Sequence, residues 1–365
     1  LYVKGFPIGG KMEKAFANEI KVSVICPTYN QGKYMRQGLD SILAQRIDAL
    51  WEIVISDDAS TDNTWEVIQE YVNSHQQCKE IEGRYIPIIR AYQINSSDYN
   101  PTVTSDRCAA NKANVYIHAK GKYCVNIDAD DYLMSDDIYA YQISLLEEHP
   151  ECSVAVQNIW YLNDGEQIEN GHTWHYKSWH EKEIITFDDY CKRRLSISNP
   201  AFMMRRDENL NPLETYGLLF DDPVISTHHI LKGKIICTNR ADYVYVQYPS
   251  SIWNQVGSVV ADKLIRDLCV YLVYYKFFPQ KSYGFLEMEI FTWIKNLKSI
   301  LQKNEQLLLS SSTKAYVSRL DFKGINRIIQ NDRLYIRILL NMALMISKFS
   351  CYDGIFASIW NKIVK

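Results

Sequence analysis

Residues 22–45 read VSVICPTYNQGKYMRQGLDSILAQ, and this stretch decides the fold class. It opens with an apolar run of strand length at 22–26 and continues through a polar loop at 27–32. Beyond the loop, apolar residues return at helical spacing, at Met35, Leu39, Ile42 and Leu43. A strand, a loop and an amphipathic helix in this order form the first half of a βαβ unit, which is typical of a mostly parallel sheet.

The alternation of strands and helices continues along the chain. Strand patterns cover 53–55, 85–89, 123–127, 154–157, 202–204, 234–238 and 243–248, and helical patterns cover 65–72, 105–119 and 221–232. From around residue 257 the pattern is helical only. The sequence therefore predicts an α/β fold, a Rossmann-like, mixed but mostly parallel sheet flanked by helices, followed by a C-terminal helical extension.

Composition excludes several classes of protein. Charged residues make up 23% and hydrophobic residues 47%, which excludes a disordered or collagen-like chain. The net charge of -3 gives no reason to expect a nucleic-acid-binding protein. The nine cysteines form no C-x-x-C pair, and no signal-like or membrane-spanning apolar run occurs. We therefore expect reduced thiols and a cytoplasmic location.

An acidic turn, DADD at residues 128–131, follows the fourth predicted strand. Carboxylates crowded at the mouth of a buried strand repel one another and lose hydration, a cost that a divalent cation normally offsets. Asp128 and Asp130 are therefore candidate ligands for Mg²⁺ or Mn²⁺, completed by substrate phosphates. The alternative is a solvated turn that leads into a helix capped by Ser135 or Asp136.

A second acidic loop, DDASTD at residues 57–62, follows the second predicted strand. Its later residues suit a helix N-cap, and we expect Thr61 or Asp62 to fill that role. Asp57 and Asp58 lie ahead of the cap. An acceptor fixed at a strand end can bind the imide N–H of uracil or thymine, or a ribose hydroxyl.

Three stretches together resemble a known family. They are VSVICPTYNQGKYMRQGLDSILAQ at 22–45, EIVISDDASTDNT at 52–64 and GKYCVNIDADDY at 121–132, in this order. In them the chain is similar to inverting glycosyltransferases of the GT-A fold, the family 2 type found in bacterial surface-polysaccharide synthesis. The resemblance covers residues 20–255 and is strongest in the first half. It implies a nucleotide-sugar donor and Mn²⁺ or Mg²⁺ as cofactor.

The resemblance also divides the chain. It implies a GT-A catalytic domain at 20–255, with a nucleotide-sugar half at 20–131 and an acceptor half at 132–255. Ahead of it we expect an N-terminal segment at 1–19, of which the residues before Met12 are treated as an addition outside the fold. A C-terminal helical region at 256–365 follows.

In similar enzymes the Pro-Thr-Tyr-Asn stretch lies against the nucleotide base and ribose, and the second acid of the Asp-Asp pair binds the base. The last aspartate of the Asp-x-Asp motif binds the metal, while the first faces the ribose or the sugar. The resemblance therefore implies a donor site made of Pro27, Thr28, Tyr29, Asn30, Asp57, Asp58, Asp128 and Ala129, with Asp130 and Asp128 as metal ligands.

A basic residue often contacts the donor in similar enzymes, and Arg107 is the candidate here. Arg107, Asn111 and Asn114 share one helical face by their spacing. The alternative is an ordinary surface arginine.

Displacement at an anomeric carbon needs a base that removes the proton of the attacking hydroxyl. The acid pair Asp221-Asp222 lies where the family carries its base, usually the second member, so Asp222 is the candidate and Asp221 the fallback. The first position is aspartate, where glutamate is common. The alternative is a helix N-terminus favoured by negative charge and by Pro223.

Aromatic residues are the candidates for the acceptor. The rings of Trp174, Trp179 and Trp253 could form a platform for a sugar, although ordinary core aromatics are the competing interpretation. Three histidines, at 172, 175 and 180, are interleaved with the first two of these tryptophans. They lack a convincing fourth ligand, which disfavours a zinc site.

The last stretch, 333–365, carries five basic residues and one acidic residue around apolar segments. It could contact an anionic membrane surface, pack on the preceding helices or form a homodimer contact.

The sequence thus predicts a metal-dependent inverting hexosyl- or N-acetylhexosaminyl-transferase that uses a UDP-sugar and a glycan or lipid-linked acceptor. It would act at the inner face of the membrane. The alternatives are a sugar nucleotidyltransferase and a non-catalytic glycan-binding or scaffold protein.

Overall fold

The computed structural model describes residues 20–81, 84–94, 104–166, 168, 171–174, 179–193, 195, 202–212, 220 and 222–248. The expected segments 1–19 and 256–365 lie outside the described residues. By its internal contacts the chain divides into two compact units. The larger unit holds every strand that the structure describes, and the smaller one holds α6 (Phe187–Lys192).

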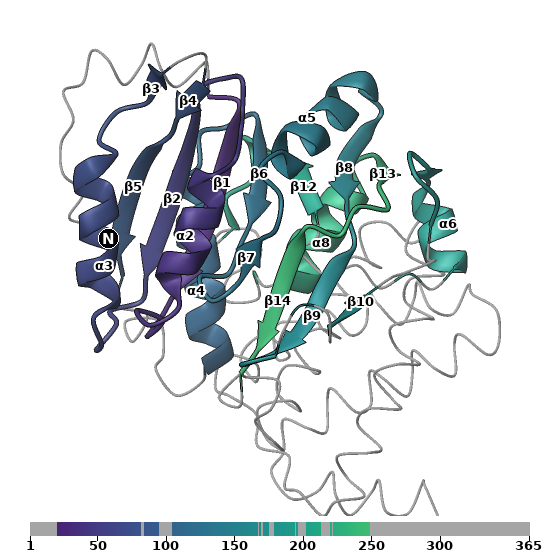
Figure 1. Ribbon diagram of the computed structural model, residues 1–365. Coiled ribbons are helices and arrows are strands. Elements are labelled where there is room, and N and C mark those ends of the chain that lie inside the picture. The colour runs from purple at the N-terminus through teal and green to yellow at the C-terminus, as the bar shows by residue number, and fades with distance from the viewer. Residues whose placement is uncertain are drawn as a thin grey trace, which may run out of the picture. The chain divides into compact units, whose positions relative to one another are not determined.

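The larger unit is built on an eight-stranded sheet in the order β11-β13-β8-β12-β6-β1-β2-β5 (Figure 1). The strands are β1 (Val22–Thr28), β2 (Trp51–Asp57), β5 (Ile88–Gln93), β6 (Tyr123–Asn126), β8 (Cys152–Val156), β11 (Ile184–Ile185), β12 (Phe202–Arg205) and β13 (Lys234–Cys237). Only β12 and β11 run against the others. This mixed, mostly parallel sheet confirms the predicted α/β fold.

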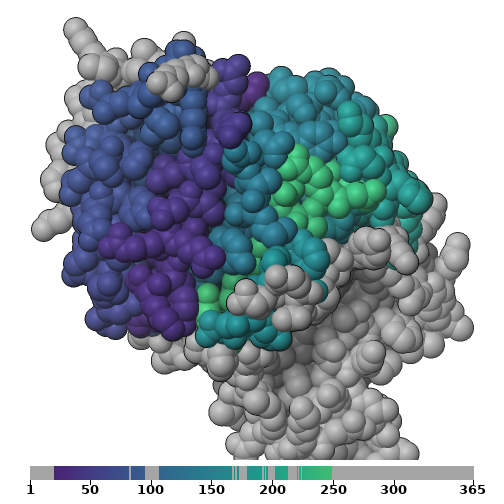
Figure 2. Space-filling view, viewed as in Figure 1, coloured from purple at the N-terminus to yellow at the C-terminus, as the bar shows by residue number. Residues whose placement is uncertain are grey.

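The central strands explain why the sheet is buried. All seven residues of β1 and all seven of β2 are buried, as expected of parallel strands that have helices on both faces. The described helices that lie wholly or mainly in this unit are α2 (Met35–Leu43), α3 (Thr64–Ser74), α4 (Thr104–His118), α5 (Ile138–Glu148) and α8 (Asp222–Ile230). Figure 2 shows the first half, in purple and blue, and the second half, in teal and green, meeting along one continuous surface.

A second sheet carries the order β10-β9-β14-β7. Its strands are β7 (Tyr132–Leu133), β9 (Ile159–Asn163), β10 (His172–Trp174) and β14 (Tyr243–Gln247). An apolar cluster of Leu162, Val244, Val246 and Tyr248 holds it together. Since β7 begins directly after the acidic turn and pairs with β14, this sheet fixes the turn from its far side.

The structure differs from the sequence prediction at 85–89, which is not one strand. Pro87 separates β4 (Arg84–Ile86), which pairs with β3 (Lys79–Ile81), from β5, which pairs with β2. Proline has no N–H to donate to a ladder, so the chain changes partner there. Within the described part of the chain, no helix is long and apolar enough to cross a membrane.

Candidate active site

The candidate site lies where three parallel strands end. In register, Thr28 of β1 pairs with Asp57 of β2, and Ile25 of β1 pairs with Asn126 of β6. The loops that follow these strands therefore emerge at the same edge of the sheet, here called the carboxyl edge (Figure 1). Ligands of open α/β sheets bind at this edge.

Arg107, Asp58 and Tyr29 form one cluster at the carboxyl edge. Arg107 Nε donates to Asp58 Oδ2 at 2.8 Å, and its guanidinium carbon lies 4.1 Å from the centroid of the Tyr29 ring. Burial alone would lower the pKa of Arg107, but hydrogen bonding to Tyr29 and the charge of Asp58 raise it above its ordinary value. Arg107 is therefore a fixed cation, and its ion pair with buried Asp58 holds it at the carboxyl edge.

The predicted polar face of α4 is confirmed. Besides Arg107, Asn111 Nδ2 donates to the Thr28 carbonyl at 3.0 Å and Asn114 Nδ2 donates to Ser56 Oγ at 2.8 Å. All three residues thus reach the ends of β1 and β2, although Asn111 Oδ1 and Thr28 Oγ1 are buried without a hydrogen-bond partner. Buried polar atoms are normally paired, so orphaned oxygens at a strand end suggest a ligand or water that completes them.

The loops after β1 and β2 are tied together under strain. Asn30 and Ala59 have φ values of 53° and 51°, in the left-handed region that non-glycine residues rarely adopt. The Asn30 N–H donates to Ser60 Oγ at 2.8 Å, and the Thr61 N–H donates to Asn30 Oδ1 at 2.7 Å. Such strain persists only where surrounding contacts enforce it, and it concentrates at functional sites.

Asp57 and Asp62 are occupied by internal contacts. Asp57 is fully buried and accepts hydrogen bonds from Ser60 and from Gln93 Nε2, the latter at 3.0 Å. Asp62 Oδ1 accepts the N–H of Thr64, the first residue of α3, at 3.0 Å, but the N-cap of this helix is Asn63, so the prediction of Thr61 or Asp62 as N-cap was wrong. Asp57 therefore braces the loop, and Asp58 is the acid beside Arg107.

The acidic turn carries carboxylates whose charge is poorly offset. Burial and the neighbouring charge of Asp128 raise the pKa of Asp130 to about 7, despite hydrogen bonds from its own backbone and from Gln31. Burial, with the charges of Asp130 and Asp128, also raises the pKa of Asp131 well above its ordinary value. The predicted crowding at 128–131 is thus present in the fold, while α5 begins at Ile138 and its N-cap is Asp137.

Asp131 anchors the turn to the second sheet. Its carboxylate accepts the Tyr243 hydroxyl at 2.5 Å and the Val246 N–H at 2.9 Å, both from β14. From the other side α2 approaches so closely that a Cβ added at Gly38 would lie 2.7 Å from the Asp131 carbonyl oxygen. The turn is therefore clamped between a helix and a strand, and Asp128 and Asp130 remain its two candidate ligand carboxylates.

The chemistry of these side chains fits a divalent metal. Mg²⁺ is usually held by one or two carboxylates together with substrate phosphates, and Mn²⁺ prefers the same oxygen ligands. Two crowded carboxylates, one with a raised pKa, form a donor set of this kind. Among the residues that the structure describes, no group of three or more His, Cys, Asp and Glu side chains could hold a metal.

The candidate base, Asp222, begins α8 and is paired. Lys112 Nζ, from α4, donates to Asp222 Oδ1 in an ion pair. The side chain of Asp222 is 38% exposed, which leaves its carboxylate open to an approaching hydroxyl. Asp221 lies outside the described residues. Lys112 was not predicted from the sequence, because its partner is far away in the chain.

The acceptor candidates fare differently from one another. Trp179 is 3% exposed and its indole N–H donates to the Thr238 carbonyl at 3.0 Å, so its ring faces the core and offers no open face to a sugar. Trp174 lies in β10, where the structure does not describe its side chain, and Trp253 lies outside the described residues.

Of the predicted donor-site residues, Ala129 is a buried part of the acidic turn and Pro27 is a buried part of β1.

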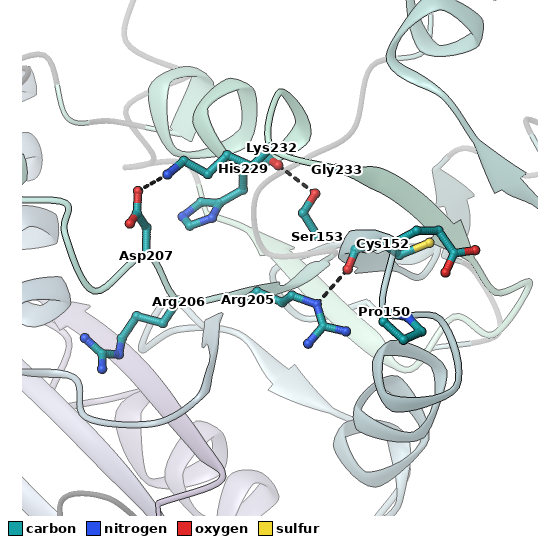
Figure 3. A pocket seen from close by; sticks show the side chains of 10 residues that line it. Pro150, Cys152, Ser153, Arg205, Arg206, Asp207, His229, Lys232 and Gly233 are labelled. Carbon is teal, nitrogen blue, oxygen red and sulfur yellow. Dashed lines mark hydrogen bonds and ion pairs between the residues drawn. The ribbon is translucent and has the colours of Figure 1, made fainter.

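The opposite edge of the sheet, where the parallel strands begin and here called the amino edge, holds a pocket (Figure 3). It is lined by Pro150, Glu151, Cys152, Ser153, Arg205, Arg206, Asp207, His229, Lys232 and Gly233. Asp207 Oδ2 accepts from His228 Nε2 at 2.8 Å and from Lys232 Nζ. Burial opposes ionisation of Asp207, but these hydrogen bonds outweigh it and lower its pKa to about 2. The charges here are matched within the protein.

The chain is similar to known glycosyltransferases. The sequence profile of Glycosyl transferase family 2 matches residues 23–86. An uncharacterized protein of Mycobacterium tuberculosis is 25% identical over 240 residues, which make up 64% of this chain and 60% of that protein. The glycosyltransferase GlyG of Streptococcus pneumoniae is 24% identical over 252 residues, 63% of this chain and 72% of GlyG. The hyaluronan synthase of Pasteurella multocida is 31% identical over 175 residues, 48% of this chain and 15% of the synthase.

The chain thus spans about 60% of the length of the mycobacterial relative. Among solved structures, S. aureus TarS matches with a TM-score of 0.55 at 16% identity, over 93% of this chain and 55% of TarS. TarS 1-349 in complex with UDP-GlcNAc matches with a TM-score of 0.53 at 16% identity, over 91% of this chain and 87% of that one. The profile match, the relatives and the fold together support a glycosyltransferase of family 2 with the GT-A fold.

Proposed function

We propose that this chain transfers a hexosyl or N-acetylhexosaminyl group from a UDP-sugar to a hydroxyl of a glycan or lipid-linked acceptor, with inversion at the anomeric carbon. Two of its similarities support this substrate class. TarS has been solved with UDP-GlcNAc, and the relative in Pasteurella multocida is a hyaluronan synthase. The product would be a bacterial capsule or another surface polysaccharide.

One observation carries the proposal. The crowded carboxylates Asp128 and Asp130 follow β6, and the Arg107–Asp58–Tyr29 cluster lies at the end of β2 and β1, so the two features flank β1 at the same edge. A nucleotide sugar has a flat base at one end and a doubly charged diphosphate before the sugar. The two features match these two ends.

The nucleoside end would bind at Tyr29. Its ring is 40% exposed, and stacking of a base on an aromatic ring contributes about 1–3 kcal/mol in single-stranded nucleic acid complexes. Asp58 would accept the imide N–H of uracil, and the strained loop at Asn30 would line the ribose. Arg107 holds both Asp58 and Tyr29 in place.

The diphosphate end would bind at the acidic turn. Asp130, together with Asp128, would hold Mn²⁺ or Mg²⁺. The bound cation would offset the charge that develops on the departing diphosphate. Asp131 and Gly38 would keep the two carboxylates at the position that this role requires.

Asp222 would serve as the base. It would take the proton of the acceptor hydroxyl as the oxygen forms its bond to the anomeric carbon, while the bond to the diphosphate oxygen breaks on the opposite side. UDP leaves with the electron pair of that bond, and the anomeric configuration inverts. Asp221 remains the fallback.

The setting of the reaction is also a proposal. We expect the protein to act in the cytoplasm at the inner face of the membrane, where a lipid-linked acceptor would be available. The segment 333–365, which lies outside the described residues, would provide peripheral membrane contact or a homodimer contact. Trp174 and Trp253 remain the candidates for an acceptor platform.

A thermal-shift panel of nucleotide sugars with and without Mn²⁺ tests the donor site, and a transfer assay with the stabilising donor tests the reaction. UDP-sugars are expected to stabilise the protein only when Mn²⁺ is present. Asp222→Asn is expected to keep donor binding and to lower transfer by about 10²–10⁴-fold, the usual contribution of a base. Transfer by Asp222→Asn at the wild-type rate would contradict the assignment.

The same assays separate the alternatives. Release of pyrophosphate from a nucleoside triphosphate would indicate a sugar nucleotidyltransferase. Glycan binding that needs neither nucleotide nor metal would indicate a non-catalytic binding or scaffold protein.

A further inference from the structure

The ion pair between α4 and α8 has a role beyond holding two helices together. Building on the proposed function, we propose that Lys112 is a positioning residue: its ammonium holds the Asp222 carboxylate in the orientation from which it can accept the acceptor's proton. Lys112 touches the base and acts on the reaction only through it.

Burial makes Lys112 a rigid anchor. Its side chain is 11% exposed, against 38% for Asp222, so the ammonium lies inside the protein and the carboxylate lies at the surface of the site. Packing restricts the rotamers of a long side chain that would move freely in solvent. A charge-assisted hydrogen bond from such an anchor fixes the direction of a carboxylate more strictly than solvent would.

The position of Asp222 shows why it needs an anchor. It is the first residue of α8, and its side chain is 38% exposed. Lys112 Nζ, from α4, donates to its carboxylate and ties it to a second element. A base must lie within hydrogen-bond reach of the proton that it takes, and small misplacements cost much of the rate.

The helix that carries Lys112 also organises the donor side. On α4, Arg107 binds Asp58 and Asn111 donates to the Thr28 carbonyl, while Lys112 turns to Asp222 on α8. One rigid helix therefore sets both the place of the nucleoside and the direction of the base. In-line attack requires these two to be aligned, which gives Lys112 a role that a purely structural ion pair would lack.

The chain contains a matched pair for comparison. Just beyond the other end of α8, Lys232 donates to Asp207, and Figure 3 shows this contact at the pocket of the amino edge. Both are lysine–aspartate ion pairs that fasten α8, but the second one lies at the opposite edge of the sheet. Lys232→Met thus reports the loss of an ion pair on α8 without a change at the base.

The test compares Lys112→Met, Lys112→Arg and Lys232→Met in the full chain, with the UDP-sugar identified by the thermal-shift panel. Lys112→Met is expected to lower kcat by about thirtyfold and to leave the Kd of UDP within twofold, because only the base is misplaced. Lys112→Arg keeps the charge and should recover at least a third of the wild-type kcat. Lys232→Met should stay within twofold of wild type.

A double variant shows whether Lys112 acts through Asp222. In the Asp222→Asn background, Lys112→Met should change the residual turnover by less than twofold. A further loss of tenfold would mean that Lys112 acts on the substrate directly, and it would overturn the proposal. Both variants in this comparison lack the Asp222 carboxylate, so Lys112→Met leaves no unpaired charge behind in that background, which removes one cause of instability in the single variant.

The outcomes for the base and for the anchor are distinguishable. If Asp222→Asn retains wild-type turnover, the proposed base is wrong. If Asp222→Asn is inactive while Lys112→Met has wild-type kcat, the base stands and the positioning role of Lys112 is refuted.

Discussion

The acidic turn at the carboxyl edge of the main sheet differs from the amino edge in how its buried charges are compensated. At the amino edge, fully buried Glu52 accepts hydrogen bonds from Ser23 Oγ at 2.6 Å and from the Lys120 N–H at 2.7 Å, and it pairs with Arg90. At the carboxyl edge, Asp130 lies beside Asp128 and its pKa rises to about 7.

A single residue type shows the contrast most directly. Asp207, near the amino edge, has its pKa lowered to about 2 because Lys232 and His228 outweigh the cost of burial. Asp130 has its pKa raised because burial and Asp128 act in the same direction. Charges that a protein matches internally support the fold, whereas charges that it crowds together are typical of a ligand site.

The largest expected effect follows from removing a charge at the carboxyl edge. Asp130→Asn keeps the size of the side chain but removes the charge of a proposed metal ligand. We expect transfer to fall by about 10³-fold and Mn²⁺-dependent UDP binding to disappear in titration calorimetry. Asp62→Asn, in the loop next to the site, is the control and should retain the Mn²⁺ dependence. UDP binding by Asp130→Asn that still needs Mn²⁺ would break the comparison.

The next effect concerns stability at the amino edge. The pKa of Asp207 is lowered in the fold, so its contribution is present above the unfolded pKa of about 4 and is lost as the pH falls toward 2. Asp207→Asn should therefore lower the free energy of unfolding by about 2 kcal/mol at pH 7, and by much less at pH 2.5. Urea denaturation at the two pH values measures this difference.

Asp130→Asn sharpens this result, because its effect on the free energy of unfolding should have the opposite sign. With its pKa raised to about 7 in the fold, Asp130 contributes stability below its unfolded pKa and loses it as the pH rises through 7. In EDTA at pH 8, Asp130→Asn should therefore unfold at higher urea than wild type. Two destabilised variants would mean that the edges do not differ as described.

The third effect tests the clamp on the acidic turn. Alanine is the better helix former, so Gly38→Ala should stabilise α2 in isolation by about 1 kcal/mol. In the protein, the added Cβ would meet the Asp131 carbonyl oxygen at 2.7 Å and the Ala129 carbonyl oxygen at 3.1 Å, both of which are backbone atoms. We expect the Mn²⁺-dependent affinity for UDP to fall about tenfold. Displacement of the acidic turn at a cost of about 1.4 kcal/mol would change the Kd by that factor.

An unchanged affinity in Gly38→Ala would show that the turn can move without loss of the metal site. Ser41→Ala is the matched control on the same helix. Its hydroxyl accepts the Leu133 N–H at 3.0 Å, beyond the turn, so its loss should affect stability more than metal dependence.

Much of the fold could be predicted, because the strands of the main sheet are continuous apolar runs. Of the second sheet, the strand at 243–248 was predicted, but the strands that pair with it were not. The residues of β9 alternate irregularly between buried and partly exposed, and Ile159 finds its partner, Tyr243, across more than eighty residues of chain. Periodicity shows which segment can form a strand, but it does not show which distant segment will cover it.

The site divides along the same line. Asp58, Asp130 and Arg107 could be predicted because each lies in a loop or on a helix face whose position follows from the local pattern. Lys112 and Gly38 could not, because their roles depend on contacts with residues far away in sequence, at Asp222 and Asp131. A lysine in a helix and a glycine in a helix each have many ordinary explanations until their neighbours are known.

The smallest expected effect tests the nucleoside end of the carboxyl edge. Tyr29→Leu removes an aromatic ring that is 40% exposed and lies 4.1 Å from the Arg107 guanidinium carbon. Loss of stacking and of the cation–π contact should cost about 1 kcal/mol, which is a roughly fivefold weaker Kd for UDP. Tyr29→Phe keeps the ring and should stay within twofold of wild type.

The affinity for pyrophosphate with Mn²⁺ separates the two ends of the donor. Because Tyr29 lies on the nucleoside side, Tyr29→Leu should leave pyrophosphate binding unchanged, whereas Asp130→Asn should abolish it. If Tyr29→Leu weakened UDP and pyrophosphate equally, the ring would be supporting the whole edge rather than the base, and the division of the site into a nucleoside end and a diphosphate end would have to be abandoned.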